Sequence, residues 1–175
     1  VRSNYLNPES AAIYDHALKL WEGLSQELNF NVMFSQRGVI NLAHDEGEAR
    51  ELRRRIYANQ LAGVDAEWVT PTQLGELCPI LNLDPNMRYP VLGGTLQRRA
   101  GTARHDAVAW GYARGADRLG VHIIENCEVT GLIIRDGRVE GVHPNRGEIR
   151  TPKIGVVAAG HSSVLAAMAD KDVAK

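Results

Sequence analysis

The run Arg104-His105-Asp106 places an imidazole between a guanidinium and a carboxylate. A neutral imidazole has one nucleophilic nitrogen, and with a reference pKa of about 6.5 much of it is neutral near pH 7. The run stands near the expected start of a long helix, whose first turn would hold the ring in a fixed direction. A histidine at a helix start is more often a cap or a surface residue than a reactive group, so the run alone leaves both interpretations open.

A second candidate is the apolar run of residues 154–159, which ends at Gly160. Nearly continuous hydrophobicity predicts a strand that is buried on both faces. The run is similar to a motif of flavoproteins with two dinucleotide-binding domains, in which the terminal glycine lets the backbone lie close to FAD. Such proteins open with a Gly-x-Gly-x-x-Gly turn, and these 175 residues contain none. An ordinary core strand explains the run equally well.

Composition limits the function classes. The 20 basic and 21 acidic residues leave a formal charge of −1, which gives no general attraction for nucleic acid or an anionic membrane. Cys78 and Cys127 lack CxxC spacing and metal-ligand neighbours, so we expect no zinc site, no disulfide framework and a cytoplasmic location. No apolar run approaches the ~20 residues of a spanning helix. The start at Val1 without Met suggests a fragment or a processed product.

Local signals predict the helices. Asn7-Pro8 begins a helix of roughly five turns, because Asn caps free amides and Pro suits the first helical position. Its apolar stripe is expected to include Ile13, Leu20, Leu24 and Leu28. The other expected helices run from Asp45 to Gly63, from Thr70-Pro71 to Leu77, from about Thr102 to Leu119 and from Ser162 onward.

Turn signals predict the strands. Residues 31–35 and 39–43 should form an antiparallel hairpin around Gln36-Arg37-Gly38. Residues 89–97 read as a strand in which Gly93-Gly94 marks a bulge or a close backbone approach. A meander is expected over residues 121–125, 128–135, 138–143 and 148–151, with a tight turn at Asp136-Gly137. The fold class is α+β in local order, with an antiparallel meander, a hairpin and several helices, cut from a larger α/β protein.

Several long runs carry a more specific resemblance. They are Arg2-Ser3-Asn4-Tyr5-Leu6, residues 20–25, residues 31–38 and above all residues 97–113. In this order they resemble the beta subunits of heterotetrameric sarcosine oxidases, a family of D-amino-acid-oxidase-like FAD-dependent oxidoreductases. The resemblance covers essentially all 175 residues. It implies an internal fragment of an α/β flavoprotein, with 1–98 mostly in the substrate domain and 99–175 in the FAD-binding domain. The FAD glycine turn would lie upstream of Val1.

The resemblance also implies roles for single residues. His105 would carry covalent FMN, because beta subunits of this family attach FMN to a histidine through the 8α-methyl carbon and the Arg-His-Asp context matches. Arg99 and Arg104 could offset negative charge on the flavin. No role is assigned to the other histidines, whose spacing suits no metal site.

Three further positions are expected to serve the full protein. Arg2 falls where related amine oxidases have an arginine that pairs with the substrate carboxylate. Val129 corresponds to a position where backbone groups contact the adenine side of FAD, although a plain strand residue is the alternative. Gly160 would lie close to FAD at the end of the predicted buried strand.

The implied activity of the full protein is oxidative demethylation of sarcosine to glycine. FAD would accept the electrons, FMN would pass them to oxygen to give hydrogen peroxide, and the one-carbon unit would go to tetrahydrofolate. The implied partners are the alpha, gamma and delta subunits, with tetrahydrofolate and NAD bound by alpha. Two alternatives stay open: a related flavin enzyme that oxidises glycine or dimethylglycine, and a scaffold fragment that binds no flavin and has no activity as an isolated chain.

Overall fold

A computed structural model describes residues 1–173, which divide into two compact units, Val1–Val121 and the residues from His122 onward. Each unit is described by itself. The helices are α1 (Pro8–Leu28), α2 (Glu46–Leu61), α3 (Pro71–Leu77), α4 (His105–Arg118), the 3₁₀ helix η1 (Ala159–His161) and α5 (Ser162–Val173). The strands are β1 (Val39–Ala43), β2 (Glu67–Val69), β3 (Gly93–Gln97), β4 (Val129–Arg135), β5 (Arg138–Pro144) and β6 (Ile149–Arg150). Helices and antiparallel sheets confirm the α+β prediction.

Helix α1 begins where the sequence predicts. The Asn7 side chain accepts hydrogen bonds from the amides of Glu9 and Ser10, and Asn29 ends the helix in the left-handed conformation. The predicted apolar stripe is only partly right. Leu24 and Leu28 are buried, but Leu20 is exposed and the buried face runs through residues that the stripe omitted. Its buried residues are Ala11, Leu18, Leu24 and Leu28.

The sheet of the first unit has the order β1-β3-β2, and both pairings are antiparallel. The predicted hairpin of residues 31–35 with 39–43 is therefore wrong. Strand β1 pairs with β3, more than fifty positions along the chain, and Ser35 forms an isolated bridge with Thr102. The glycines of β3 explain this choice, because a Cβ at Gly94 would come within 2.6 Å of the Asn41 carbonyl oxygen. Close strand contact here requires glycine.

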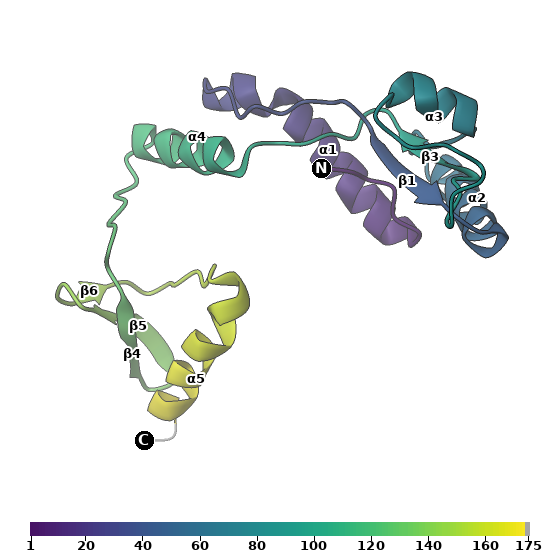
Figure 1. The fold of residues 1–175 in the computed structure, drawn as a ribbon. Coiled ribbons are helices and arrows are strands. Elements are labelled where there is room, and N and C mark those ends of the chain that lie inside the picture. Colours follow the sequence, from purple (N-terminus) through teal and green to yellow (C-terminus); the bar gives the residue numbers. More distant parts are fainter. Residues whose placement is uncertain (174–175) are drawn as a thin grey trace. The chain divides into compact units, whose positions relative to one another are not determined.

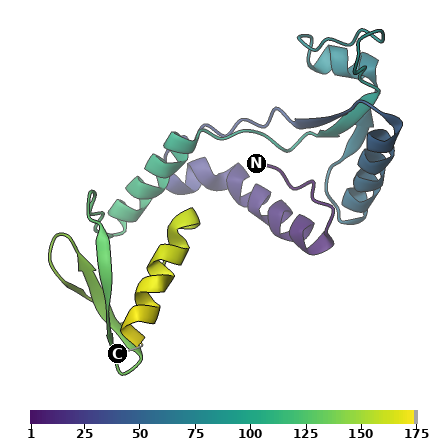
Figure 2. The ribbon, with the colours of Figure 1, turned by 60° about the horizontal axis from the view of Figure 1, so that its bottom comes forward.

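Successive side chains of β3 point to opposite faces of the sheet, and a different helix covers each face. Leu96 faces α3, where it packs with Val69 and Leu74. Thr95 and Gln97 point to the other face, which α2 covers. Figures 1 and 2 show α2 and α3 on opposite sides of the sheet. All five residues of β3 are buried, so this strand is the centre of the unit.

Helix α4 starts at His105, three residues later than the sequence predicted. Its buried residues are Gly111 and Gly115, which lie against Leu28 at the end of α1. Tyr112, predicted to face the core, is exposed. The glycines bring α4 into close contact with the C-terminal end of α1 and the residues that follow it.

The second unit is a three-stranded antiparallel sheet, β4-β5-β6, on which α5 packs. The predicted turn is confirmed, since Asp136 and Gly137 have φ angles of 50° and 71° between β4 and β5. The prediction of a strand at residues 121–125 is wrong, and so is that of a doubly buried strand at 154–159. No strand in the described part of the chain pairs with residues 154–159, and Val157 is 96% exposed.

None of the helices in residues 1–173 is both long and apolar enough to cross a membrane. Nor do residues 1–173 contain a group of three or more His, Cys, Asp or Glu side chains placed to hold a metal ion.

Candidate functional site

His105 is the first residue of α4, and it is exposed. Its neighbours form a pair of their own: Arg104 Nε donates to Asp106 Oδ1 at 2.9 Å. This hydrogen bond, helped by the backbone amide of Ala107, lowers the pKa of the Asp106 carboxyl. Within residues 1–173 the imidazole has no hydrogen bond or ion pair. Both ring nitrogens are therefore without a partner among the described residues.

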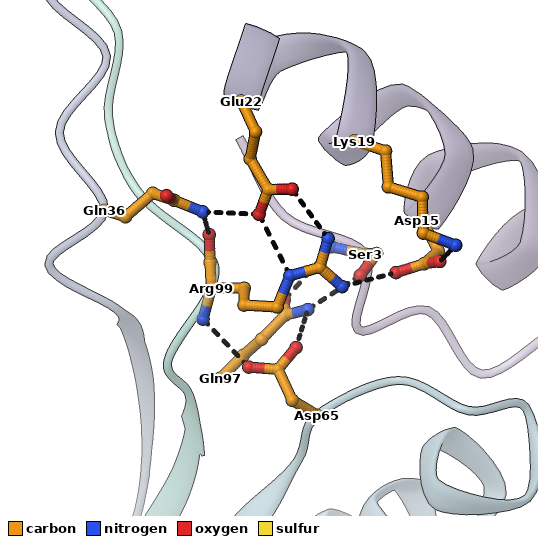
Figure 3. A network of polar contacts seen from close by, with 8 residues as sticks. All are labelled: Ser3, Asp15, Lys19, Glu22, Gln36, Asp65, Gln97 and Arg99. Atoms are coloured by element: carbon orange, nitrogen blue, oxygen red, sulfur yellow. Dashed lines mark hydrogen bonds and ion pairs between the residues drawn. The ribbon is translucent and has the colours of Figure 1, made fainter.

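Arg99 lies at the centre of a polar network (Figure 3). Its Nε and Nη2 donate to the two carboxylate oxygens of Glu22, each at 3.0 Å, and its Nη1 donates to Asp15 at 3.2 Å. The hydrogen bond to Glu22, with the charges of Glu22 and Asp15, raises the Arg99 pKa. Both carboxylates belong to α1. Because its charge is balanced inside the protein, Arg99 is poorly suited to the predicted role of offsetting flavin charge.

The network holds the N-terminal segment beside the residues that follow β3. Gln97 Nε2 donates to Ser3 Oγ at 2.7 Å, and Gln97 Oε1 accepts from the Ser3 amide at 3.0 Å. Val1 and Gly101 exchange two backbone hydrogen bonds, of 2.7 and 2.9 Å. These contacts bracket Arg2 on both sides. The structure thus brings Arg2 next to the segment that leads into His105, although a hundred residues separate them in sequence.

Arg2 differs from Arg99 in what it contacts. Its Nη1 donates to Asn4 Oδ1 at 3.2 Å, and the guanidinium carbon lies 5.0 Å from the centre of the Tyr5 ring. No carboxylate among the described residues forms an ion pair with Arg2. A half-buried guanidinium without an anionic partner can take a carboxylate in a two-pronged bond.

The sequence did not reveal the partners in this network. Arg99 is 77 residues from Glu22 and 84 from Asp15. Asp65, which accepts from the Arg99 amide at 2.8 Å and from Gln97 at 3.2 Å, lies in a loop without a motif. No local spacing marks such residues. The one signal available is a polar residue, Gln97, at the end of a predicted apolar strand, since a fully buried Gln97 must find hydrogen-bond partners.

Val129 and Gly160 belong to the second unit. Val129 is half-buried at the start of β4, where it stands opposite Pro144 next to a register shift. The Asn145 amide donates to the Glu128 carbonyl at 2.9 Å, so Val129 and Pro144 form a pair whose own backbone groups do not bond each other. Gly160 lies in η1 instead of ending a strand, and a Cβ there would meet no atom within 4 Å among the described residues. Both positions leave room for contact with another group.

Comparison with known proteins gives consistent results. The family described as DAO, FAD dependent oxidoreductase, matches residues 1–175. Sarcosine oxidase subunit beta from an Arthrobacter species is 56% identical over 97% of this chain and 42% of that protein. The subunit of the same name from Rhodobacter capsulatus is 54% identical, over 97% of this chain and 41% of that protein. The chain therefore spans about two fifths of the length of these curated relatives.

A solved structure supports the fold. The L-proline dehydrogenase from P. horikoshii matches with a TM-score of 0.88 and 24% identity, over 97% of this chain and 44% of that one. At this identity the likeness concerns the fold alone. Its coverage of 97% of the chain includes most of both units.

Proposed function

The chain belongs to the FAD dependent oxidoreductase family, and from that premise we propose that it is part of the beta subunit of a sarcosine oxidase. The observation that carries the proposal is identity of 53 to 56% to three sarcosine oxidase beta subunits over 97% of the chain. The human mitochondrial sarcosine dehydrogenase is only 28% identical over 83% of the chain, which disfavours a dehydrogenase.

In this proposal Arg2 binds the carboxylate of sarcosine. Its guanidinium has no carboxylate partner in the described residues, and two backbone bonds between Val1 and Gly101 fix the segment that carries it. A pre-positioned guanidinium loses little freedom when it takes a carboxylate, which favours binding. Arg99 supports the same segment through Asp65 and Gln97, so we assign it to positioning rather than to contact with the substrate.

His105 is the proposed tether for FMN. Its ring is exposed and unbonded, whereas both flanking charges are occupied with each other. The imidazole of His105 would hold FMN through a covalent bond to the 8α carbon of the flavin, and the packing of the α4 glycines on the end of α1 fixes the backbone that carries this ring. The Arg104–Asp106 pair is exposed and nearly neutral as a unit. We therefore expect it to orient the start of α4 more than to balance flavin charge.

The residues of this chain suit only part of an FAD site. Val129, opposite a proline, and Gly160, in an open turn, would supply backbone contacts to the dinucleotide. We propose that the residues from His122 onward belong to the FAD-binding domain and that β1, β2 and β3 belong to the substrate domain, which moves the boundary from residue 98 toward the division of the two units. When bound, the flavins would supply the redox chemistry that oxidises the N-methyl group of sarcosine and reduces oxygen to hydrogen peroxide.

The remaining parts of the proposal concern the assembly. Relatives named as beta subunits support an enzyme of more than one subunit. The proposed partners are alpha, gamma and delta subunits, with the one-carbon unit passing to tetrahydrofolate. We propose a cytoplasmic location, in keeping with two free cysteines, Cys78 and Cys127.

Intact mass spectrometry of the full-length protein from flavin-replete cells tests the role of His105. The wild type should carry an adduct of the mass of FMN, and His105→Ala should lack it. His16→Ala, which removes another exposed histidine of the same unit, serves as the matched control and should keep the adduct. An unmodified wild-type mass, or an adduct that survives His105→Ala, would contradict the assignment.

A further inference from the structure

A small cavity lies between α2 and the sheet, and His105 is not among the residues that line it. Its volume is about 10 Å³, and polar side chains from three parts of the chain line it together with the apolar residues Ile56, Ala66 and Leu96. Arg55 and Asn59 come from α2, Thr95 from β3 and Asn4 from the N-terminal segment. Asn59 is fully buried, and Thr95 and Asn4 are almost so. Polar side chains buried this deeply need hydrogen-bond partners at the cavity.

Two polar atoms at this cavity have no hydrogen-bond partner among the described residues. They are Arg55 Nε, a donor, and Asn59 Oδ1, an acceptor, and both atoms are inaccessible to bulk solvent. The amide orientation of Asn59 is fixed by its nitrogen, which donates to the Arg55 carbonyl at 2.7 Å and to the Tyr5 carbonyl at 3.3 Å. The oxygen is therefore left as an acceptor. Buried polar atoms in native proteins are nearly always bonded to protein or to ordered water.

The two atoms without partners and the volume of the cavity determine which kind of molecule can bind there. The site offers one donor and one acceptor, so the bound molecule must both accept and donate. A cation would meet the Arg55 guanidinium, and an anion would meet the partial negative charge of Asn59 Oδ1. The volume is about what one water molecule needs. Of these classes, water alone satisfies both atoms and fits.

We propose that this cavity is a binding site for one ordered water, which accepts from Arg55 Nε and donates to Asn59 Oδ1. The Thr95 hydroxyl accepts from Asn41 at 3.0 Å, and its own hydrogen can bond the same water. Asn4 lines the cavity and accepts from Arg2, while Tyr5 accepts from Asn59. The water thus completes the packing of residues 4 and 5 on α2. It helps to hold the segment that carries Arg2, whatever ligand that arginine binds.

Crystal structures of the full-length protein test the proposal. The wild-type map should contain one density peak within hydrogen-bond distance of Arg55 Nε and Asn59 Oδ1. Arg55→Met removes the donor and should abolish the peak. Arg54→Met is the matched control, because Arg54 directly precedes Arg55 in α2 but does not line the cavity. Its side chain pairs with Glu51 at 2.9 Å. Its map should keep the peak.

Each other outcome overturns the proposal. A wild-type cavity without density, at a resolution where other internal waters are visible, excludes the water. A halide peak in the anomalous map of a bromide-soaked crystal would assign the site to an anion. A fully occupied peak that persists in Arg55→Met would mean that the water does not bridge these two atoms. Because the wild-type map already decides occupancy, a variant that fails to fold leaves the test intact.

Discussion

Arg99→Met should loosen the junction between α1 and the residues after β3. The substitution keeps an apolar stem but removes three hydrogen bonds to Glu22 and Asp15. Breaking a buried ion pair costs about 3 to 5 kcal/mol, whereas an exposed pair contributes about 0.2 to 1 kcal/mol. The Arg99, Glu22 and Asp15 side chains are 35%, 32% and 17% exposed, between these limits.

The expected loss is about 2 kcal/mol, because the two carboxylates keep other partners. Lys19 Nζ lies 2.9 Å from Asp15, and Gln36 donates to Glu22 at 2.9 Å, so neither carboxylate is left unpaired. A change of this size multiplies the local opening constant by about 30. Amides of residues 97–102 should therefore exchange hydrogen about 30-fold faster in the full-length variant, as measured by mass spectrometry of peptides.

Lowering the pH should remove the difference in hydrogen-exchange rate between the wild type and Arg99→Met. Hydrogen bonds from Arg99 and then from Gln36 lower the Glu22 pKa below its usual value of 4.5 in the folded protein. A depressed carboxyl pKa stabilises the fold above the unfolded-state pKa, and this contribution is lost as pH falls through the folded-state pKa. The ratio of exchange rates should be largest near pH 7 and should shrink progressively below about pH 4.5.

The control and the result that would contradict the prediction are both measured as hydrogen exchange in residues 97–102. Arg54→Met removes a pair with Glu51 in which the two side chains are 67% and 42% exposed, so residues 97–102 should exchange as in the wild type. If Arg99→Met changes exchange in residues 97–102 no more than Arg54→Met does, the network does not hold this segment. A difference that grows below pH 4.5 would contradict the assigned direction of the Glu22 pKa.

Three other perturbations have definite expected outcomes. Gly101→Ala would place a Cβ 2.8 Å from the Gln36 Cα and against the Ser35 carbonyl, so thermal unfolding should show a loss of about 3 kcal/mol, while Gly23→Ala, in open space on α1, should not destabilise. Asn7→Ala should lower the free energy of unfolding by about 1 kcal/mol through loss of the α1 cap, and a denaturant titration in which Asn7→Asp falls equally far would refute this reason. The isolated 175-residue chain should show no stoichiometric flavin absorbance, because it lacks the glycine turn that cradles pyrophosphate; a one-to-one flavin spectrum would contradict this.

Local chemistry allowed much of the fold to be predicted. Asn7-Pro8 and Thr70-Pro71 predicted two helix starts, and Asp136-Gly137 predicted a hairpin, because each signal acts within about four residues. Strand partners could not be predicted in the same way. The choice of β3 over residues 31–35 as the partner of β1 depends on glycines more than fifty positions away.

The candidate site also combines features that the local sequence predicts with features that depend on distant residues. His105 and Arg2 could be singled out from the runs that contain them, since residue type and context are properties of the sequence. That Arg99 is neutralised by α1, and that Arg2 lies beside Gly101, follows from pairing across the whole first unit. Residues 154–159 were predicted to be a buried strand from hydrophobicity alone, which cannot specify a neighbouring strand.

The pairing of Val1 with Gly101 has a consequence for synthesis on the ribosome. The central strand β3 comes last of the three in the sheet, so neither the sheet nor the N-terminal segment can reach its final partners until about residue 102 has been made. At 5 to 20 residues per second, this delay is about 5 to 20 seconds. During that time Leu24 and Leu28 can pack with nearby residues such as Val32, but the contacts of α1 with α4 cannot yet form. Rare codons before β3 would therefore lengthen the time during which β1 and β2 lack their partner strand. Rare codons after β3 would slow synthesis only once β1 and β2 can already pair with β3.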